Sequence, residues 1–134
     1  GPAGCTPKQH DLEGGEGTLI EDYTLHYLST QLDGVPGAIG RPSPLPPTCF
    51  AIKKTDAETS NMIPTDTLSI YAYAPSEYEA AQLNERIKQA MQAMAGQDAI
   101  CNVAFYTDFS DDDTEYKVPR YQSIYNVTYY SDEV

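Results

Sequence analysis

The sequence predicts an α+β domain in two layers, with two helices packed on a mainly antiparallel sheet of four or five strands. Three observations lead to this class. Two segments carry apolar residues at helical spacing behind a capping motif, four segments alternate apolar and polar residues, and most of these strands follow one another through turns. Strands joined by turns pair antiparallel, and an amphipathic helix between strands needs a sheet face to cover. The predicted order is α-β-β-α-β-β.

A single domain is expected over residues 18–134, because 134 residues fit one domain with a modest core. Residues 1–17 read GPAGCTPKQHDLEGGEG, which has no hydrophobic periodicity and is rich in glycine. We expect this segment to be flexible and to lie outside the fold. Because it lacks a methionine, we also expect part of it to be a cloning remnant.

The first helix is predicted to begin at residues 18–21, TLIE, which match a capping box with Thr18 as the N-cap and Glu21 reaching back. Apolar residues continue at helical spacing, and Gly34 supplies the stop. Residues 34–48, GVPGAIGRPSPLPPT, are too rich in proline and glycine for a helix, and they leave room for a short strand at residues 38–39.

Two strands and the second helix follow. Residues 49–54, CFAIKK, form the first predicted strand. Residues 67–74, TLSIYAYA, alternate cleanly and form the next strand. A second capping box at residues 76–79, SEYE, opens a helix predicted to reach residue 95. The apolar stripe expected to face the sheet consists of Ala80, Leu83, Ile87, Ala90, Met91 and Met94.

The last part of the chain predicts a hairpin with aromatic residues. Residues 99–109 alternate as a strand, residues 110–116 form an acidic turn, and residues 117–130, KVPRYQSIYNVTYY, form a closing strand. Tyr121, Tyr125 and Tyr129 share one face of that strand. If the second helix covers the other face, the three tyrosines suit a protein–protein interface. The alternative is ordinary cross-strand packing with Tyr71 and Tyr73, and the sequence favours neither.

Composition narrows the class of function. The net charge is −12, and such a surface repels nucleic-acid phosphates, so a DNA- or RNA-binding role is not expected. The three cysteines form no C-x-x-C pair. Cys49 and Cys101 lie in strand-like segments and are predicted to be core thiols, which indicates a reducing compartment. No apolar segment approaches the ~18 residues that span a membrane.

We find no signature of catalysis or cofactor binding in the sequence. His10 and His26 have no metal-ligand spacing, and there is no phosphate loop or nucleophile elbow. The run 111–113 of three aspartates lacks the ligand pattern of a calcium loop. It is either a solvated hairpin tip or an acidic surface used in assembly. A small hydrolase using the carboxylates between Asp108 and Glu115 is the enzymatic alternative.

The layout of these elements resembles a known family. A helix and a Pro-rich crossing are followed by SIYAYAPSEYEAAQLNERIKQAM, and the chain closes on VPRYQSIYNVTYY, with RYQ at residues 120–122. Over residues 18–131 this resembles the tail-terminator proteins, also called tail-completion or minor capsid proteins, of long-tailed bacteriophages and prophages. The glycine-rich first residues have no counterpart in that family.

The resemblance implies a structural subunit with no enzymatic activity, metal or cofactor. It implies a ring of identical subunits, usually a hexamer, that caps the tail tube, stops its polymerisation and meets the head connector. The partners implied are other copies of the chain, the major tail protein and the head–tail connector proteins. The location implied is the virion, with the host cytoplasm during assembly. The alternatives are another head-completion subunit or a regulatory α+β module that binds a small molecule.

Candidate residues follow from this resemblance together with the pattern of the strands. The predicted assembly interface uses the segment 55–65 and the closing strand, and its members are Met62, Arg120, Tyr121, Tyr125 and Tyr129. In a ring through which DNA passes, acidic walls keep the duplex mobile. The residues predicted to face such a channel are Asp111, Asp112, Asp113 and Glu115.

Overall fold

The structure is a computed structural model that describes residues 19–57 and 62–134. The predicted α+β class and the order of its elements are confirmed. The elements are α1 (Ile20–Gln31), β1 (Gly37–Ile39), β2 (Cys49–Ala57), β3 (Thr65–Tyr73), α2 (Glu77–Met94), β4 (Ile100–Ser110) and β5 (Arg120–Tyr129). Thr18 and the segment 1–17 lie outside the described residues, so the expectations for them have no outcome.

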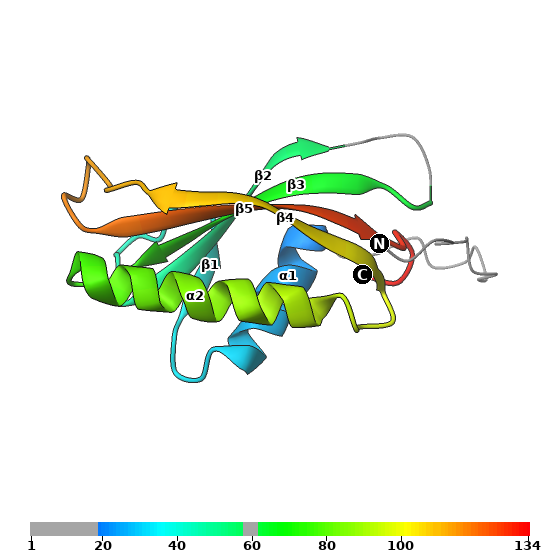
Figure 1. Cartoon of the computed structure of the whole chain (residues 1–134), viewed down its shortest axis with the longest axis horizontal. Helices are drawn as coiled ribbons and strands as arrows, with labels where there is room; N and C mark the ends of the chain where they lie inside the picture. The colour runs from blue at the N-terminus through cyan, green and yellow to red at the C-terminus, as the bar shows by residue number, and fades with distance from the viewer. Residues whose placement is uncertain (1–18, 58–61) are drawn as a thin grey trace.

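The sheet has five strands in the order β1-β2-β3-β5-β4. The short β1 runs parallel to β2, and every other neighbouring pair is antiparallel. Both helices lie on one side of the sheet, so the molecule has two layers, and α2 runs along the strands in front of α1 (Figure 1). In this strand order the last strand of the chain, β5, lies inside the sheet, and β4 forms one edge of the sheet.

The start of α1 differs from the prediction. The helix begins at Ile20 with Leu19 as the N-cap, and the side chain of Leu19 makes no capping hydrogen bond. The N-cap therefore lies one residue later than predicted, and the side chain of Thr18 lies outside the described residues. Oε1 of Glu21 lies 3.8 Å from Nζ of Lys54 on β2. The predicted stop is confirmed, since Gly34 has φ +77° just after the helix.

The second helix matches its prediction closely. Oγ of Ser76 accepts a hydrogen bond from the backbone N–H of Glu79 at 3.1 Å, as an N-cap does. Every residue of the predicted apolar stripe is buried, and Asn84 is buried beside the stripe. Together with residues of α1, β2, β3 and β5 these side chains form a single hydrophobic core between the helices and the sheet.

The register of the sheet decides which side of β5 faces the helices. Leu68 pairs with Tyr125, and both are buried in the core under α2. The opposite side of β3 and β5 carries polar pairs instead. Across it the hydroxyls of Thr65 and Thr128 lie 2.8 Å apart, and Oγ1 of Thr67 donates to Oδ1 of Asn126 at 2.8 Å. The uncovered face of the sheet thus carries hydrogen-bonded polar pairs in this part, and further along it Cys49, Ala51 and Tyr73 form a small hydrophobic cluster.

The short strand β1 depends on a close backbone contact. A Cβ atom at Gly37 would lie 2.2 Å from Cζ of Phe50, whose ring is fully buried across the β1–β2 pair. Only glycine allows β1 to approach β2 over this ring. None of the helices in the described residues is long and apolar enough to cross a membrane.

Candidate assembly surfaces

The outer edge of β4 is the most exposed aromatic surface on the described residues. β4 is an edge strand of 11 residues with register shifts near Cys101 and Tyr106. Tyr106 is 70% exposed, and Phe105 and Phe109 are 49% and 43% exposed. An edge strand presents unpaired backbone groups, and aromatic residues beside them favour contact with another chain. We call residues 100–110 with these side chains the β4 edge.

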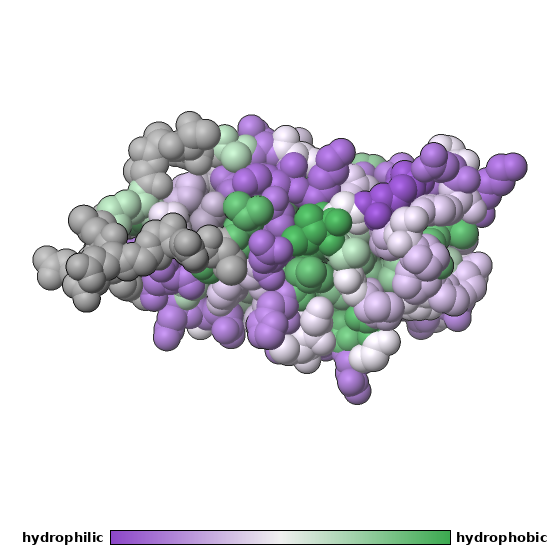
Figure 2. Space-filling model, turned by 180° about the vertical axis from the view of Figure 1, so that it is seen from behind, coloured by the Kyte–Doolittle hydropathy of each residue, from purple (hydrophilic) through white to green (hydrophobic). Residues whose placement is uncertain are grey.

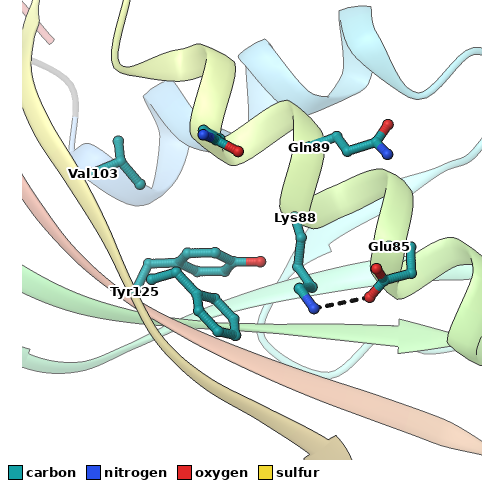
Figure 3. A pocket seen from close by; sticks show the side chains of 7 residues that line it. Glu85, Lys88, Gln89, Val103 and Tyr125 are labelled. Atoms are coloured by element: carbon teal, nitrogen blue, oxygen red, sulfur yellow. Dashed lines mark hydrogen bonds and ion pairs between the residues drawn. The ribbon is translucent and has the colours of Figure 1, made fainter.

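A groove of about 420 Å³ lies between α2 and the β4 edge. Its floor is apolar and consists of Val103, Phe105 and Tyr125. The rings of Phe105 and Tyr125 meet edge to face with centroids 5.8 Å apart. The rim is polar and comes from one side of α2, with Glu85, Lys88, Gln89 and Gln92. Figure 3 shows Lys88 reaching down from α2 toward the floor, whereas Gln89 points sideways along the rim.

Charged groups hold the rim of this groove in place. Nζ of Lys88 lies 2.9 Å from Oε2 of Glu85 and 3.0 Å from Oδ2 of Asp108 (Figure 3 shows the first pair). It also lies 5.0 Å from the centroid of the Phe105 ring. The hydrogen bonds from Lys88 to Glu85 and then to Asp108 raise the pKa of Lys88, so its charge persists at all ordinary pH values. Nδ2 of Asn84 donates to the same Asp108 oxygen at 2.8 Å.

A second hollow, of about 470 Å³, lies on the other side of the sheet at the β1–β2 edge. Four of the eight basic residues of the chain line it: Arg41, Lys53, Lys54 and Arg120. We call it the basic hollow. β1 covers β2 only as far as Ile52, so the edge of β2 from Lys53 to Ala57 has no strand beside it within the described residues. Seen from behind, this side has a hydrophobic patch near its middle, surrounded by hydrophilic side chains (Figure 2).

The basic residues of the hollow differ in whether carboxylates of the same chain pair with them. Arg41 and Arg120 bind carboxylates of the turn between β4 and β5. Lys54 lies 3.8 Å from Glu21 and 3.9 Å from Asp66. Lys53 is exposed and has no ion pair with any described residue. It is the cation most available to an acidic partner.

The acidic turn is built around one buried carboxylate, Asp113, for which the predictions of a solvated tip and of a channel wall are wrong. Asp113 is only 1% exposed. Its Oδ1 accepts hydrogen bonds from the backbone N–H groups of Glu115 and Tyr116, both at 2.9 Å. Arg41 binds both of its oxygens, and Nη1 of Arg120 lies 3.2 Å from Oδ2. Asp113 therefore faces the protein and is excluded from a wall lining a channel.

The pKa of Asp113 reflects this setting. Burial acts to raise the pKa, but the two backbone N–H groups and the two arginines outweigh it and hold the pKa below its ordinary value of 3.8. The other members of the run lie differently. Asp111 is half-buried and pairs with Arg120 at 2.9 Å, Glu115 is exposed and pairs with Arg41 at 3.1 Å, and Asp112 is exposed. Within this turn, Asp112 is the exposed carboxylate that has no ion pair with any described residue.

Arg120 was predicted to lie at an interface, and it organises the same turn. Its Nε donates to the backbone oxygen of Asp111 at 2.8 Å, and its guanidinium lies over the rings of Tyr71 and Tyr73, 4.8 and 5.6 Å from their centroids. Arg120 is thus half-buried by internal contacts. Its role inside the chain is to join the turn to the uncovered face of the sheet.

The tyrosine interface predicted on β5 is wrong for two of its three members. Tyr125 and Tyr129 point toward the helices and are 1% and 8% exposed. The hydroxyl of Tyr129 donates to the buried Oδ2 of Asp66 at 2.6 Å, and that of Tyr125 to Oγ of Ser123 at 2.8 Å. Tyr121 is half-buried against the same core. The alternative of packing with Tyr71 and Tyr73 is also wrong, because those two lie on the other face.

The remaining predicted residues have mixed outcomes. Met62 is 39% exposed, and its backbone oxygen accepts a hydrogen bond from the N–H of Ser131 at 3.0 Å. Cys49 is a buried free thiol whose pKa burial raises to about 11. Cys101 is disulfide-bonded, so its prediction as a core thiol is wrong, and a disulfide argues against the reducing compartment inferred from it. His26 is exposed on α1.

The aromatic residues of the β4 edge are the functional candidates that the sequence prediction missed. The signal was present in the FYTDF motif at residues 105–109, which alternates but carries large rings on both sides. Within the described ranges, no group of histidine, cysteine and acidic residues is placed to hold a metal ion. No family model matches the chain, and no curated protein sequence matches it.

Proposed function

We propose that the chain is a structural subunit of the neck of a phage or prophage tail, and that it acts as the tail terminator. The observation that carries the proposal is the β4 edge, an edge strand with exposed aromatic residues beside an apolar groove. The chain has a net charge of −12, and its acidic surface keeps it in solution. Exposed aromatic residues on an edge strand work against that solubility, so they are best explained as a contact surface for another protein. The sequence resemblance over residues 18–131 indicates that the assembly is the end of a phage tail.

In this proposal the chain works by forming a ring on the end of the tail tube. Copies of the chain contact one another through sheet edges, and the ring presents one face to the tube and the other to the head connector. No chemical reaction or cofactor is part of this function. The two layers of the fold make the subunit rigid, so a ring of such subunits offers the tube a fixed end at which polymerisation stops.

The test of this proposal uses a lysogen that carries the gene. Deleting the gene and inducing the prophage should give unattached heads together with tails of uncontrolled length, as seen by electron microscopy. Expression of the intact chain in trans should restore joined particles with tails of one length. Tails of normal length that fail to join heads would assign the chain to head completion instead. Normal particles from the deletion would remove it from the neck altogether.

A second measurement addresses the ring itself. The purified chain, alone or bound to purified tail tubes, should give ring-shaped particles in electron micrographs. A hexamer would have six times the 14.7 kDa mass of one chain. A gene for a major tail protein directly downstream would further favour a terminator over another neck subunit.

A further inference from the structure

We infer that copies of this chain associate head to tail, with the β4 edge and groove of one copy receiving the β1–β2 edge of the next. This inference rests on the proposed function, because it names the two surfaces that would close a ring. The occupant of the groove is a second copy of the same chain. The two surfaces differ in shape and in charge, and they lie at opposite ends of one sheet.

The first argument comes from the sheet. Its two free edges are the β4 edge on one side and, on the other, the short β1 together with β2 beyond Ile52. A contact between unlike edges repeats in the same sense from copy to copy and generates a ring when the rotation closes. A contact between two like edges would stop at a dimer. Addition of a strand at an edge is a common way for chains to associate.

The second argument comes from charge. Three carboxylates flank the β4 edge and the groove, those of Glu77, Glu85 and Asp108, and among the described residues Lys88 is the only cation on the rim. At the other edge, three of the four basic residues of the hollow are paired with carboxylates of the same chain, and Lys53 has no ion pair with any described residue. Pairing two β4 edges would bring acidic groups together, whereas pairing unlike edges brings the acidic groups of the β4 edge to Lys53.

The third argument comes from the apolar surface. The floor of the groove is made of aromatic and aliphatic groups, and its rim is polar, which is the arrangement of a contact patch. The β1–β2 edge presents one exposed hydrophobic side chain of matching kind, Ile39, which is 42% exposed and lines the basic hollow. In the contact we infer, Ile39 meets the aromatic residues while Lys53 meets the acidic rim.

The experiment uses one variant of each surface. Tyr106→Asp places a charge on the β4 edge, and Lys53→Glu reverses the free cation of the β1–β2 edge. Both side chains are exposed, so the fold should be preserved, which circular dichroism would verify. Matched controls exist elsewhere on the chain. Tyr78, on α2, is 72% exposed, and Lys117 is an exposed lysine of the β4–β5 turn. The control variants are therefore Tyr78→Asp and Lys117→Glu.

Sedimentation equilibrium of the full chain, measured up to millimolar concentration, should show that the unmodified chain associates beyond a dimer. Each edge variant alone should raise the apparent dissociation constant roughly tenfold or more, and the controls should leave it unchanged. An equimolar mixture of the two edge variants retains one intact pair of surfaces. It should therefore form a one-to-one heterodimer and nothing larger.

Other outcomes contradict the inference in distinct ways. If Lys53→Glu associates normally while Tyr106→Asp does not, two β4 edges meet and the contact is symmetric. If the unmodified chain stays monomeric at every concentration, the edges do not bind each other. Normal association of both variants removes both surfaces from the contact. These outcomes decide how copies of the chain contact one another, and the role of the chain at the neck of the tail is tested separately by the prophage deletion.

Discussion

Asp113 joins three parts of the chain that are distant in sequence. Its carboxylate binds Arg41 from the Pro-rich connection, Arg120 from β5 and the backbone of its own turn. The partner Arg41 is 72 residues away, which explains why the sequence showed only an acidic run. A buried carboxylate with two arginines and two backbone donors is therefore a structural element of the turn.

Replacement of Asp113 by asparagine should lower the free energy of unfolding by about 1–3 kcal/mol at pH 7, because the arginines lose their charged partner. The matched control is Asp112→Asn, which changes an exposed neighbour and should stay within about 0.5 kcal/mol. Urea unfolding followed by circular dichroism measures both. Equal stability of the two variants would mean that the Asp113 contacts contribute nothing.

The stabilisation from Asp113 should also depend on pH in a defined direction. The pKa of this carboxyl is lower in the folded chain than its ordinary value of 3.8. Its contribution is therefore complete above pH ~4 and declines as the pH falls through the pKa of the folded state. The difference in unfolding free energy between the native chain and Asp113→Asn should be constant from pH 5 to 7 and should shrink below about pH 4. A difference that grows on acidification contradicts this account.

Tyr129 and Tyr125 provide a second pair of residue-scale tests. Removal of the Tyr129 hydroxyl by substitution with phenylalanine leaves the buried carboxylate of Asp66 without its donor, and should cost about 1–3 kcal/mol. The same substitution at Tyr125 breaks a bond to a neutral serine and should cost about 0.5–1.5 kcal/mol. Thermal or urea unfolding of the two variants distinguishes them. A larger loss of stability for the Tyr125 variant would contradict the view that the hydrogen bond to Asp66 contributes more than the one to Ser123.

At the scale of elements, α2 is the support on which the groove depends. Ile87 is fully buried against the sheet, while Gln82 on the same helix is exposed. Ile87→Ala should lower the free energy of unfolding by about 2–5 kcal/mol. Gln82→Ala should change it by less than about 0.5 kcal/mol. If both variants melt like the native chain, α2 does not pack on the sheet in this way.

Helices and strands with a strong hydrophobic periodicity could be predicted from the sequence. Which side of each strand faces the helices could not be predicted. The stripe of α2 and the alternation of β3 each fix which residues share a side, and the structure agrees. Alternation in β5 also grouped Tyr121, Tyr125 and Tyr129 correctly. It could not say that this side faces the helices, because that depends on the register of Tyr125 against Leu68. Register is set by pairing between distant strands.

The candidate surfaces were harder to predict because they arise between elements. The groove needs α2 beside the β4 edge, and the basic hollow gathers residues from the Pro-rich connection, β2 and β5. In the sequence these basic residues are scattered among twenty acidic ones. The N-cap of α1 lies one residue later than predicted, because a capping motif is a local preference that tertiary packing can shift.

For the whole molecule, Asp112 is the residue on which the channel hypothesis can still be tested. Asp113 is buried, and Asp111 and Glu115 are engaged by arginines. Under the proposed function, Asp112→Lys should leave stability and the ring intact. If this turn faces a lumen, the variant should slow DNA ejection, and more so at low salt, where charges act over a longer distance. Asp112→Asn is the control that removes charge without reversing it. Ejection at the normal rate in both would place the turn on the outside.

The central position of β5 has a consequence for how the chain is made. During translation β3 and β4 leave the ribosome before β5, yet both pair with β5 and neither pairs with the other. A nascent chain that ends before Arg120 can form only the β1–β2–β3 part of the sheet. The β4 edge and its groove therefore do not exist on an incomplete polypeptide. A subunit cannot offer this surface to a neighbour until its synthesis has passed β5, so contacts through it select chains in which β5 is already in place.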